Sequence, residues 1–295
     1  MKIGVVLFVT DVALSPAALA RKCESLGFES IFMPEHTVIP VDRKTPYVWG
    51  TGGEHGEDEM PDYYWHLPDP FIALALAASV TTRIKLGTGI CLVPEHEPIA
   101  LAKEIATLDR YSDGRFLFGI GAGWLVEESE VMGVEFRRRW PMTREYIRAM
   151  KELWTKPEAT FEGRFVRFPA VRCYPKPAQR PHPPVLIGAG GMGPSCERAL
   201  KDTVAIGDGW APSWIGPNRL ARETARLKGL CAEAGRDLDQ IEISVFLRPQ
   251  PGADPRRTIE RYREAGAHRL VFNLPPLDSS RADSVLEDLA RQYLP

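Results

Sequence analysis

The sequence predicts an α/β fold, specifically a (β/α)₈ barrel with insertions after the second and fourth strands, in one domain over residues 1–295. Short β-branched and apolar runs alternate with amphipathic segments along the whole chain. The stretch 83–124 has the pattern strand, helix, strand, which is typical of a right-handed βαβ unit. A chain of 295 residues with 44% hydrophobic residues is long enough for one such barrel.

The βαβ unit is the clearest part of this pattern. Residues 84–90 form a β-branched run that breaks at glycine, as a buried strand does. Apolar residues then recur at helical spacing over 101–108, with polar residues on the opposite face. Residues 115–120 form the next buried strand. Both strands end in glycines, which leaves bare backbone at the carboxyl ends where such folds bind ligands.

The other elements follow in order along the chain. Ser15 caps a helix with Pro16 at its first position, and Gly27 ends it. Further helices are predicted over 71–80, 142–154, 220–231, 256–264 and 282–293, with one more beginning near Pro194. The predicted barrel strands are residues 2–9, 30–33, 84–90, 115–120, 185–187, 203–206, 241–247 and 268–272.

Two long segments interrupt the alternation. Residues 37–70 are rich in Gly, Pro, Tyr, Trp and acidic residues, and loops of this length are usually functional. We interpret this segment as an active-site lid whose aromatic side chains cover a planar ligand; the alternative is an insertion whose aromatic residues pack locally. In the second segment, 158–184, the stretch TFEGRFVRF alternates like an exposed hairpin.

Composition excludes several classes of function. The net charge of −2 is spread along the chain without a basic stripe, so we expect no nucleic-acid partner. The longest apolar run, 71–80, is too short to span a membrane, and the first residues enter a strand directly. The five cysteines show neither metal-ligand spacing nor a disulfide framework. We therefore expect a cytoplasmic protein without a metal or a membrane partner.

The strand ends suggest a cofactor rather than hydrolytic machinery. The sequence contains no G-x-S-x-G elbow and no H-E-x-x-H pair. GAGGMGP, at 188–194, lies between a strand and a helix and would cradle a phosphate, although such a stretch also suits a simple tight turn. His36 is the imidazole at a strand end and opens the predicted lid; its alternative role is structural. The pattern favours a large phosphorylated cofactor.

Several motifs carry a resemblance to a known family. These are AALARKCESLGFESIFMPEH, LGTGICLVPEHEPIALAKEIATLDRYSDGRFLFGIGAGWLVEE, and PVLIGAG with GDGW. They resemble the luciferase-like monooxygenase superfamily over essentially the whole chain, and most closely its members that depend on the deazaflavin coenzyme F420. Relatives that use flavin mononucleotide (FMN) share the fold.

The resemblance implies a flavin or deazaflavin at the carboxyl face of the barrel, a homodimer, and a cis peptide bond between Gly89 and Ile90. It implies that His36 is the catalytic residue, beside the reactive edge of the ring. The implied cofactor-binding residues are Thr88, Gly89 and Ile90 behind the ring, Gly188, Ala189, Gly190 and Gly191 around the phosphate, and Asp208, Gly209 and Trp210 along the tail. Gly121 is a further expected cofactor-binding residue. The expected substrate lid comprises Tyr47, Trp49, Tyr64, Trp65 and Trp124.

One position departs from the family. The sugar-phosphate dehydrogenases of this superfamily have a glutamate proton donor where this chain has Trp124, and an indole cannot replace it in acid–base chemistry. Glu127 and Glu128 follow in the sequence, but nothing in the sequence shows that they reach the site.

The expected function is hydride transfer with reduced F420 on a small organic substrate, planar or apolar rather than charged. One alternative is an FMN-dependent monooxygenase that activates O₂, which needs the same barrel. An alternative of another class is a non-catalytic flavin-binding protein, because barrels serve many functions.

Overall fold

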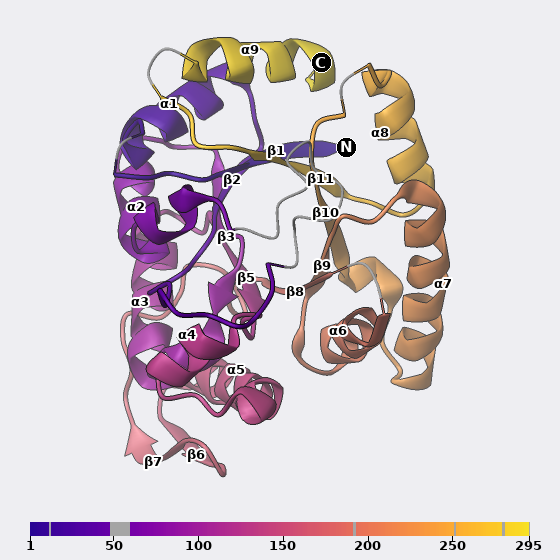
Figure 1. The fold of residues 1–295 in the computed structure, drawn as a ribbon. Coiled ribbons are helices and arrows are strands. Elements are labelled where there is room, and N and C mark those ends of the chain that lie inside the picture. Colours follow the sequence, from indigo (N-terminus) through magenta and orange to yellow (C-terminus); the bar gives the residue numbers. More distant parts are fainter. Residues whose placement is uncertain (12, 48–59, 191–192, 251, 279–280, 295) are drawn as a thin grey trace.

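The structure is a computed structural model, and it describes residues 1–11, 13–47, 60–190, 193–250, 252–278 and 281–294. Within these residues, eight parallel strands form a closed barrel, as predicted, because β3 pairs with β5 as well as with β2 (Figure 1). Two-residue strand β4 (Cys91–Leu92) extends the sheet beside β5. The barrel strands are β1 (Lys2–Leu7), β2 (Ser30–Met33), β3 (Lys85–Thr88), β5 (Phe116–Gly121), β8 (Val185–Gly190), β9 (Gly209–Ser213), β10 (Glu242–Leu247) and β11 (Arg269–Leu274).

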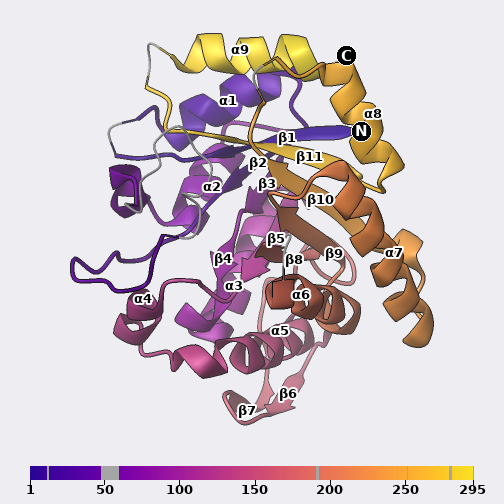
Figure 2. The same ribbon diagram turned by 45° about the vertical axis from the view of Figure 1, so that its right-hand side comes forward.

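Helices surround the barrel on its outside (Figures 1 and 2). They are α1 (Pro16–Leu26), α2 (Pro70–Ala78), α3 (Pro98–Tyr111), α4 (Val126–Val131), α5 (Arg139–Thr155), α6 (Gly193–Ile206), α7 (Pro217–Glu233), α8 (Pro255–Glu264) and α9 (Ala282–Tyr293). Short 3₁₀ helices are η1 (Asp62–His66), η2 (Val93–Glu95), η3 (Phe136–Arg138) and η4 (Leu238–Gln240). None of the helices in the described ranges is long and apolar enough to cross a membrane.

Helix α1 shows how the sequence sets the element boundaries. The Ser15 hydroxyl accepts a hydrogen bond from the backbone N–H of Ala18, and Pro16 opens the helix. Gly27 ends it with a left-handed backbone, φ +94°, which glycine adopts without steric cost. Both predicted ends of this helix are therefore confirmed.

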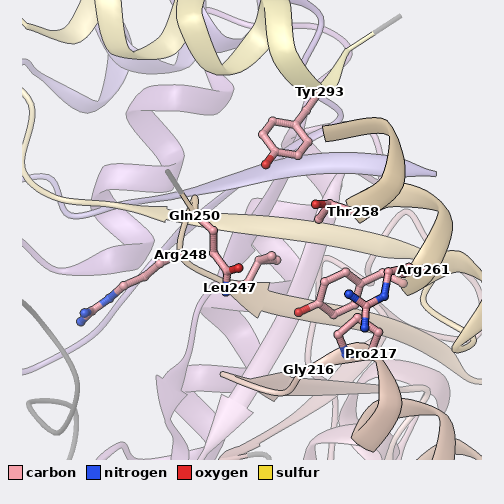
Figure 3. Close-up of a pocket in the computed structure, with 9 residues that line it drawn as sticks. Gly216, Pro217, Leu247, Arg248, Gln250, Thr258, Arg261 and Tyr293 are labelled. Carbon is pink, nitrogen blue, oxygen red and sulfur yellow. The ribbon is translucent and has the colours of Figure 1, made fainter. Parts of the chain in front are cut away.

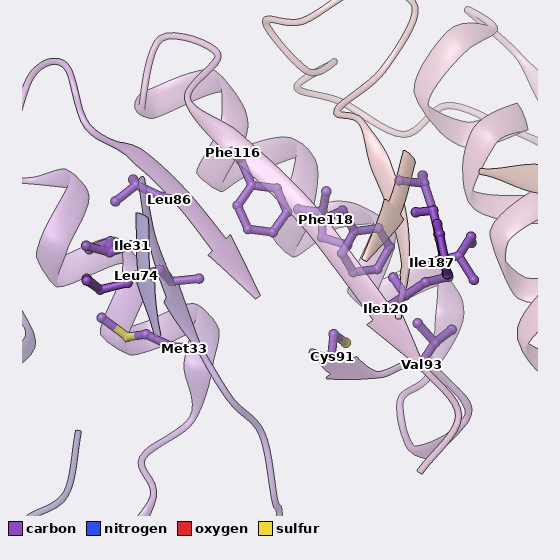
Figure 4. Packing of buried hydrophobic residues seen from close by; sticks show 14 of the residues in the cluster. Ile31, Met33, Leu74, Leu86, Cys91, Val93, Phe116, Phe118, Ile120 and Ile187 are labelled. Atoms are coloured by element: carbon purple, nitrogen blue, oxygen red, sulfur yellow. The ribbon is translucent and has the colours of Figure 1, made fainter. Parts of the chain in front are cut away.

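Apolar side chains fill two layers. The inside of the barrel holds one cluster, formed by Val6, Phe32, Leu117, Leu186, Ala211, Phe246 and Val271. The strand side chains that alternate with these point outward and pack against the helices. Ile31 and Leu86, for example, lie near Leu74 of α2 (Figure 4). Because the strands are buried on both faces, most of their residues are apolar.

A buried arginine closes the amino end of the barrel. Arg269, at the start of β11, is 1% exposed and donates hydrogen bonds to Glu29 at 2.8 and 2.9 Å. It also pairs with Glu242, at the start of β10, and donates to the Ser244 hydroxyl at 2.8 Å. Lys2 pairs with the other oxygen of Glu242 at 2.6 Å. This charged plug leaves the carboxyl end of the barrel as the end where a ligand would enter.

The structure corrects one predicted strand. Residues 203–206 are not a strand but the end of helix α6, and the sixth barrel strand is β9, which begins at Gly209. The structure also gives the bounds of the hairpin in the insertion after the fourth barrel strand. This hairpin, β6 (Ala159–Glu162) and β7 (Arg167–Val171), is confirmed and projects beyond α5 (Figures 1 and 2).

Candidate functional site

The floor of the barrel mouth is formed by Ile90. The peptide bond between Gly89 and Ile90 is cis, as the family resemblance predicts. A Cβ atom at Gly121 would overlap Ile90 Cδ1, and one at Gly188 would lie 2.8 Å from Ile90 Cγ2. These two glycines, at the ends of β5 and β8, therefore make room for the Ile90 side chain, which remains partly exposed. Their direct contact with a cofactor stays a prediction.

Thr88 is buried in the wall of the barrel and does not line its mouth. It is fully buried, and its hydroxyl donates a 2.6 Å hydrogen bond to the Gly119 carbonyl oxygen, which ties β3 to β5. A Cβ atom at Gly119 would overlap the Thr88 carbonyl oxygen. The close approach of these two strands explains the glycine at 119 without a ligand.

The end of β8 fits a phosphate group. Gly188, Ala189 and Gly190 are the last residues of β8, and α6 begins at Gly193, so the helix N-terminus lies at the mouth. On the other side of the barrel, Asn273 Oδ1 is buried and has no hydrogen-bond partner among the described residues. A bound ligand would supply the donor that this oxygen lacks. Gly191, also predicted to bind the phosphate, lies outside the described residues.

His36 pairs with a buried carboxylate. Its Nδ1 lies 2.6 Å from Glu128 Oε2, and Glu128, on α4, is 1% exposed. The other oxygen of Glu128 accepts the backbone N–H of Thr37 at 2.9 Å. Because a carboxylate only accepts hydrogen bonds, His36 Nδ1 is the donor. In the described part of the chain, Nε2 of His36 makes no hydrogen bond, so it is the nitrogen available for proton transfer.

The neighbouring residue, Glu127, binds the backbone of the long segment 37–70 at a later point than Glu128 does. Its Oε1 accepts the backbone N–H groups of Lys44 at 2.7 Å and Thr45 at 3.0 Å. Burial raises the pKa of Glu127, but these hydrogen bonds outweigh it and lower the pKa to about 2. Helix α4 therefore fixes both His36 and the first part of the predicted lid. Nothing local in the sequence shows this, because the partners are 80 or more positions apart.

A third carboxyl group, Glu95, lies behind Glu128. Glu95 is 7% exposed; its Oε1 accepts from the Ser129 hydroxyl at 3.1 Å, and its Oε2 is buried without a partner among the described residues. Burial and then the charge of Glu128 raise the pKa of Glu95 to about 8. At pH 7 Glu95 is therefore neutral, which leaves Glu128 as the charged partner of His36.

Glu95→Gln should change how stability depends on pH. The folded protein keeps the Glu95 proton up to about pH 8, whereas the unfolded chain releases it near its ordinary pKa of 4.5. Stability should therefore fall as the pH rises from about 4.5 to 8. Glutamine removes this dependence and should stabilise the protein at pH 9 by about 2–4 kcal/mol. Urea unfolding at pH 5, 7 and 9 would measure it; equal pH slopes for both proteins would contradict the buried neutral acid.

A second network lies on the far side of η2. Glu35 Oε2 accepts the Leu92 backbone N–H at 2.5 Å, and its Oε1 lies 2.7 Å from His96 Nε2. Burial lowers the pKa of His96, but Glu35 outweighs this and raises it. Cys91 lies within 4.8 Å of both ligand atoms, yet burial raises its thiol pKa well above the ordinary value. We interpret this group as a hydrogen-bonded ion pair; the absence of a metal stays a prediction.

Aromatic residues of the predicted lid gather beside His36. The Tyr47 and Tyr64 hydroxyls are 3.0 Å apart, and both rings are buried. The His36 ring centroid lies 5.4 Å from that of Tyr64 and 6.0 Å from that of Trp124. Trp65 does not join this cluster, because 48% of it is exposed. Trp49 lies outside the described residues, and movement of the segment as a lid stays a prediction.

The predicted contacts of Asp208, Gly209 and Trp210 with the cofactor tail are wrong. Gly209 begins β9 and pairs with Glu242, so all three residues lie at the amino end of the barrel. Asp208 Oδ2 accepts the Val185 backbone N–H at 2.9 Å. Trp210 is fully buried between β9 and the helices. The error follows from the misplaced sixth strand, which put the same residues after a strand instead of before one.

Comparisons with known proteins relate the chain to one family. The sequence model of the luciferase-like monooxygenase family matches residues 15–285. An uncharacterized protein of Mycobacterium tuberculosis strain H37Rv is 39% identical over 292 residues, covering 98% of each chain. The F420-dependent glucose-6-phosphate dehydrogenase of Kineococcus radiotolerans is 32% identical over 67% of this chain and 58% of its own.

A solved structure matches the whole fold. The monooxygenase RslO1 of Streptomyces bottropensis superposes with a TM-score of 0.75 at 20% identity, covering 100% of this chain and 99% of its own. The structural match covers the whole chain, and the family model covers every barrel strand except β1. The chain therefore belongs to the luciferase-like monooxygenase family.

Proposed function

We propose that the protein, an oxidoreductase of this family, transfers a hydride between coenzyme F420 and a small organic substrate. The observation that carries the proposal is the pairing of His36 with the buried Glu128 next to the Ile90 floor. When bound, the deazaflavin supplies the hydride. Reduction of a carbonyl or imine also needs one proton, and the protonated Nε2 of His36 would donate it. Glu128 would hold the ring orientation and stabilise the imidazolium.

The other residues of the mouth would bind and orient. Ile90 would support one face of the ring, and Gly188 to Gly190 with the N-terminus of α6 would hold the phosphate. Tyr47, Tyr64 and Trp124 would exclude water from the side of His36.

The relationship to the Kineococcus enzyme supports F420 as the cofactor but not glucose 6-phosphate as the substrate. At the end of β5, Trp124 stands where the sugar-phosphate enzymes have their acid, and its ring lies against Tyr47 and His36. Glu127 and Glu128 do not replace that acid, because both are held by backbone N–H groups.

An FMN-dependent monooxygenase is the second candidate. The family name supports it, and the buried aromatic cluster would also protect an oxygen-activating site from water. The pairing of His36 with Glu128 favours hydride transfer over this candidate, because hydride transfer to a carbonyl or imine also requires a proton.

Cofactor titration would test the proposal. We expect F420 to bind at least about tenfold more tightly than FMN, which is a difference of about 1.4 kcal/mol. Fluorescence quenching of each cofactor by the purified protein measures both dissociation constants. Tighter binding of FMN, with O₂ consumption by the reduced complex, would favour the monooxygenase instead. Binding of neither cofactor would exclude both.

A further inference from the structure

The mouth of the barrel has two halves of different chemistry. On the side of β3, β5 and β8 its inward positions are glycines, and Ile90 lies on them. On the opposite side, Ala211, Phe246 and Val271 point into the barrel. Side chains alternate along a strand, so the residues two positions later also face the mouth. Those residues are Ser213 and Asn273, inside their strands, and Arg248, the first residue after β10. All three are polar.

Arg248 lies directly across the mouth from Ile90. In the closed order of strands, β10 is four strands from β3 in either direction. A ring supported by Ile90 on one face would therefore turn its other face, where a substrate lies, toward Arg248. Leu247 is paired with Phe272, so the next residues, Arg248 and Asn273, are neighbours across β10 and β11.

The Arg248 side chain is exposed and extends away from helix α8. Figure 3 shows it pointing away from Thr258 and Arg261, with which it lines one cavity. Its guanidinium carbon lies 4.9 Å from the centre of the Trp214 ring. Among the described residues, no carboxylate forms an ion pair with it.

The charge of Arg248 reaches the aromatic cluster beside His36. Burial raises the pKa values of Tyr47, Tyr63 and Tyr64, and Arg248 opposes that rise at all three. An exposed guanidinium that lies over an indole, and whose charge acts on three nearby tyrosines, is a site for an anionic oxygen group. Asn273, with its amide at the next register position, would add a hydrogen bond to that group or to the adjacent oxygen of the ligand.

We propose that Arg248 binds a carboxylate of the substrate, so that the protein acts on small apolar or aromatic molecules carrying one carboxylate. The proposal rests on the function proposed above, because that function places the substrate between the ring and β10. A single guanidinium matches a monoanion, whereas a phosphate monoester carries about −1.5 to −2 charges at pH 7. The proposed substrate is thus uncharged at its reacting end and charged at the other end, whereas the aromatic segment of the sequence suggests a planar or apolar molecule rather than a charged one.

The test compares acids with their neutral amides. Benzoate, 3-phenylpropionate and 4-phenylbutyrate, with the three corresponding amides, would be titrated calorimetrically into the cofactor-loaded protein and into the protein alone. In the wild-type protein, at least one acid should bind about tenfold or more tightly than its amide. Arg248→Met should abolish the difference, and Arg248→Lys should keep part of it. Arg261→Met, the matched control on the other side of that cavity, should keep all of it.

The outcomes separate this proposal from the previous one. Equal binding of acids and amides by the wild-type protein, or an acid preference that survives in Arg248→Met, overturns the carboxylate site. A loss of F420 affinity in Arg248→Met with the acid preference retained would assign Arg248 to the cofactor tail. If neither F420 nor FMN binds, the proposed function is overturned. Calorimetry on the protein alone would still report on Arg248. Circular dichroism confirms that each variant is folded.

Discussion

His36→Ala should lower the rate of hydride transfer by about 10²- to 10⁴-fold, because it removes the group that moves the proton. Glu128→Gln should lower it by about 10²-fold or more, although the imidazole remains. Glutamine presents an amide in place of the second acceptor oxygen, so the Nδ1–H tautomer of His36 loses its charged partner. Dissociation constants for the cofactor should change less than rates in both variants, since neither side chain belongs to the Ile90 floor or to the proposed phosphate site at the end of β8.

A spectroscopic measurement separates this role from simple support of the fold. The ¹⁵N chemical shifts of the His36 ring should show the proton on Nδ1 in the wild-type protein and a mixture of tautomers in Glu128→Gln. Glu130→Gln is the matched control, because Glu130 lies exposed on the same helix. Identical ring spectra in wild type and Glu128→Gln would show that the carboxylate does not set the tautomer.

Arg269→Met should cost about 3 kcal/mol of unfolding free energy, because it leaves two carboxylates without their cation. Arg269 is 1% exposed, and the Glu29 and Glu242 side chains are 28% and 25% exposed. Lys2 would still neutralise part of the Glu242 charge. The midpoint of urea unfolding measures the loss, and the folded variant should bind cofactor normally because the plug lies at the closed end.

Arg291→Met provides the comparison for the plug. Arg291 pairs with Asp288 on the surface of α9, where both side chains are more than half exposed. Such pairs contribute about 0–1 kcal/mol. Burial raises the pKa of Glu242, but Arg269 and Lys2 outweigh it, so the net pKa is lowered. Stability from the plug should therefore be present at neutral pH and be lost as the pH falls below about 4.5. Equal losses in the two arginine variants would mean that the plug contributes no more than a surface pair.

The fold was predictable where local chemistry decides it. Ser15, Pro16 and Gly27 define α1 without any tertiary information, because capping depends on residues within one turn. The sixth strand was not predictable in this way. Residues 203–206, TVAI, form an apolar β-branched run that a buried helix end and a strand share. The true strand, GWAPS, contains glycine and proline and depends on its neighbours β8 and β10.

In the site, too, only the features that depend on local sequence were predictable. A histidine at a strand end was predictable as a candidate, since barrels place their chemistry there. Its partner, Glu128, was not, because only the closed barrel brings α4 next to the segment after β2. The glycines at 121 and 188 stand out in the sequence, but the neighbour that requires them in the structure is Ile90. Close packing between strand ends leaves no local trace beyond the glycine itself.

The two halves of the mouth should differ in how freely they can evolve. Around Ile90 the backbones approach so closely that almost any added atom collides, so this half should accept few substitutions. Ser213 and Arg248 belong to the half that no such contacts constrain. Changes there would alter which molecule the enzyme accepts while the half around Ile90 keeps its shape. A library randomised at Ser213, Arg248 and Asn273 is therefore the shortest route from this barrel to new substrates.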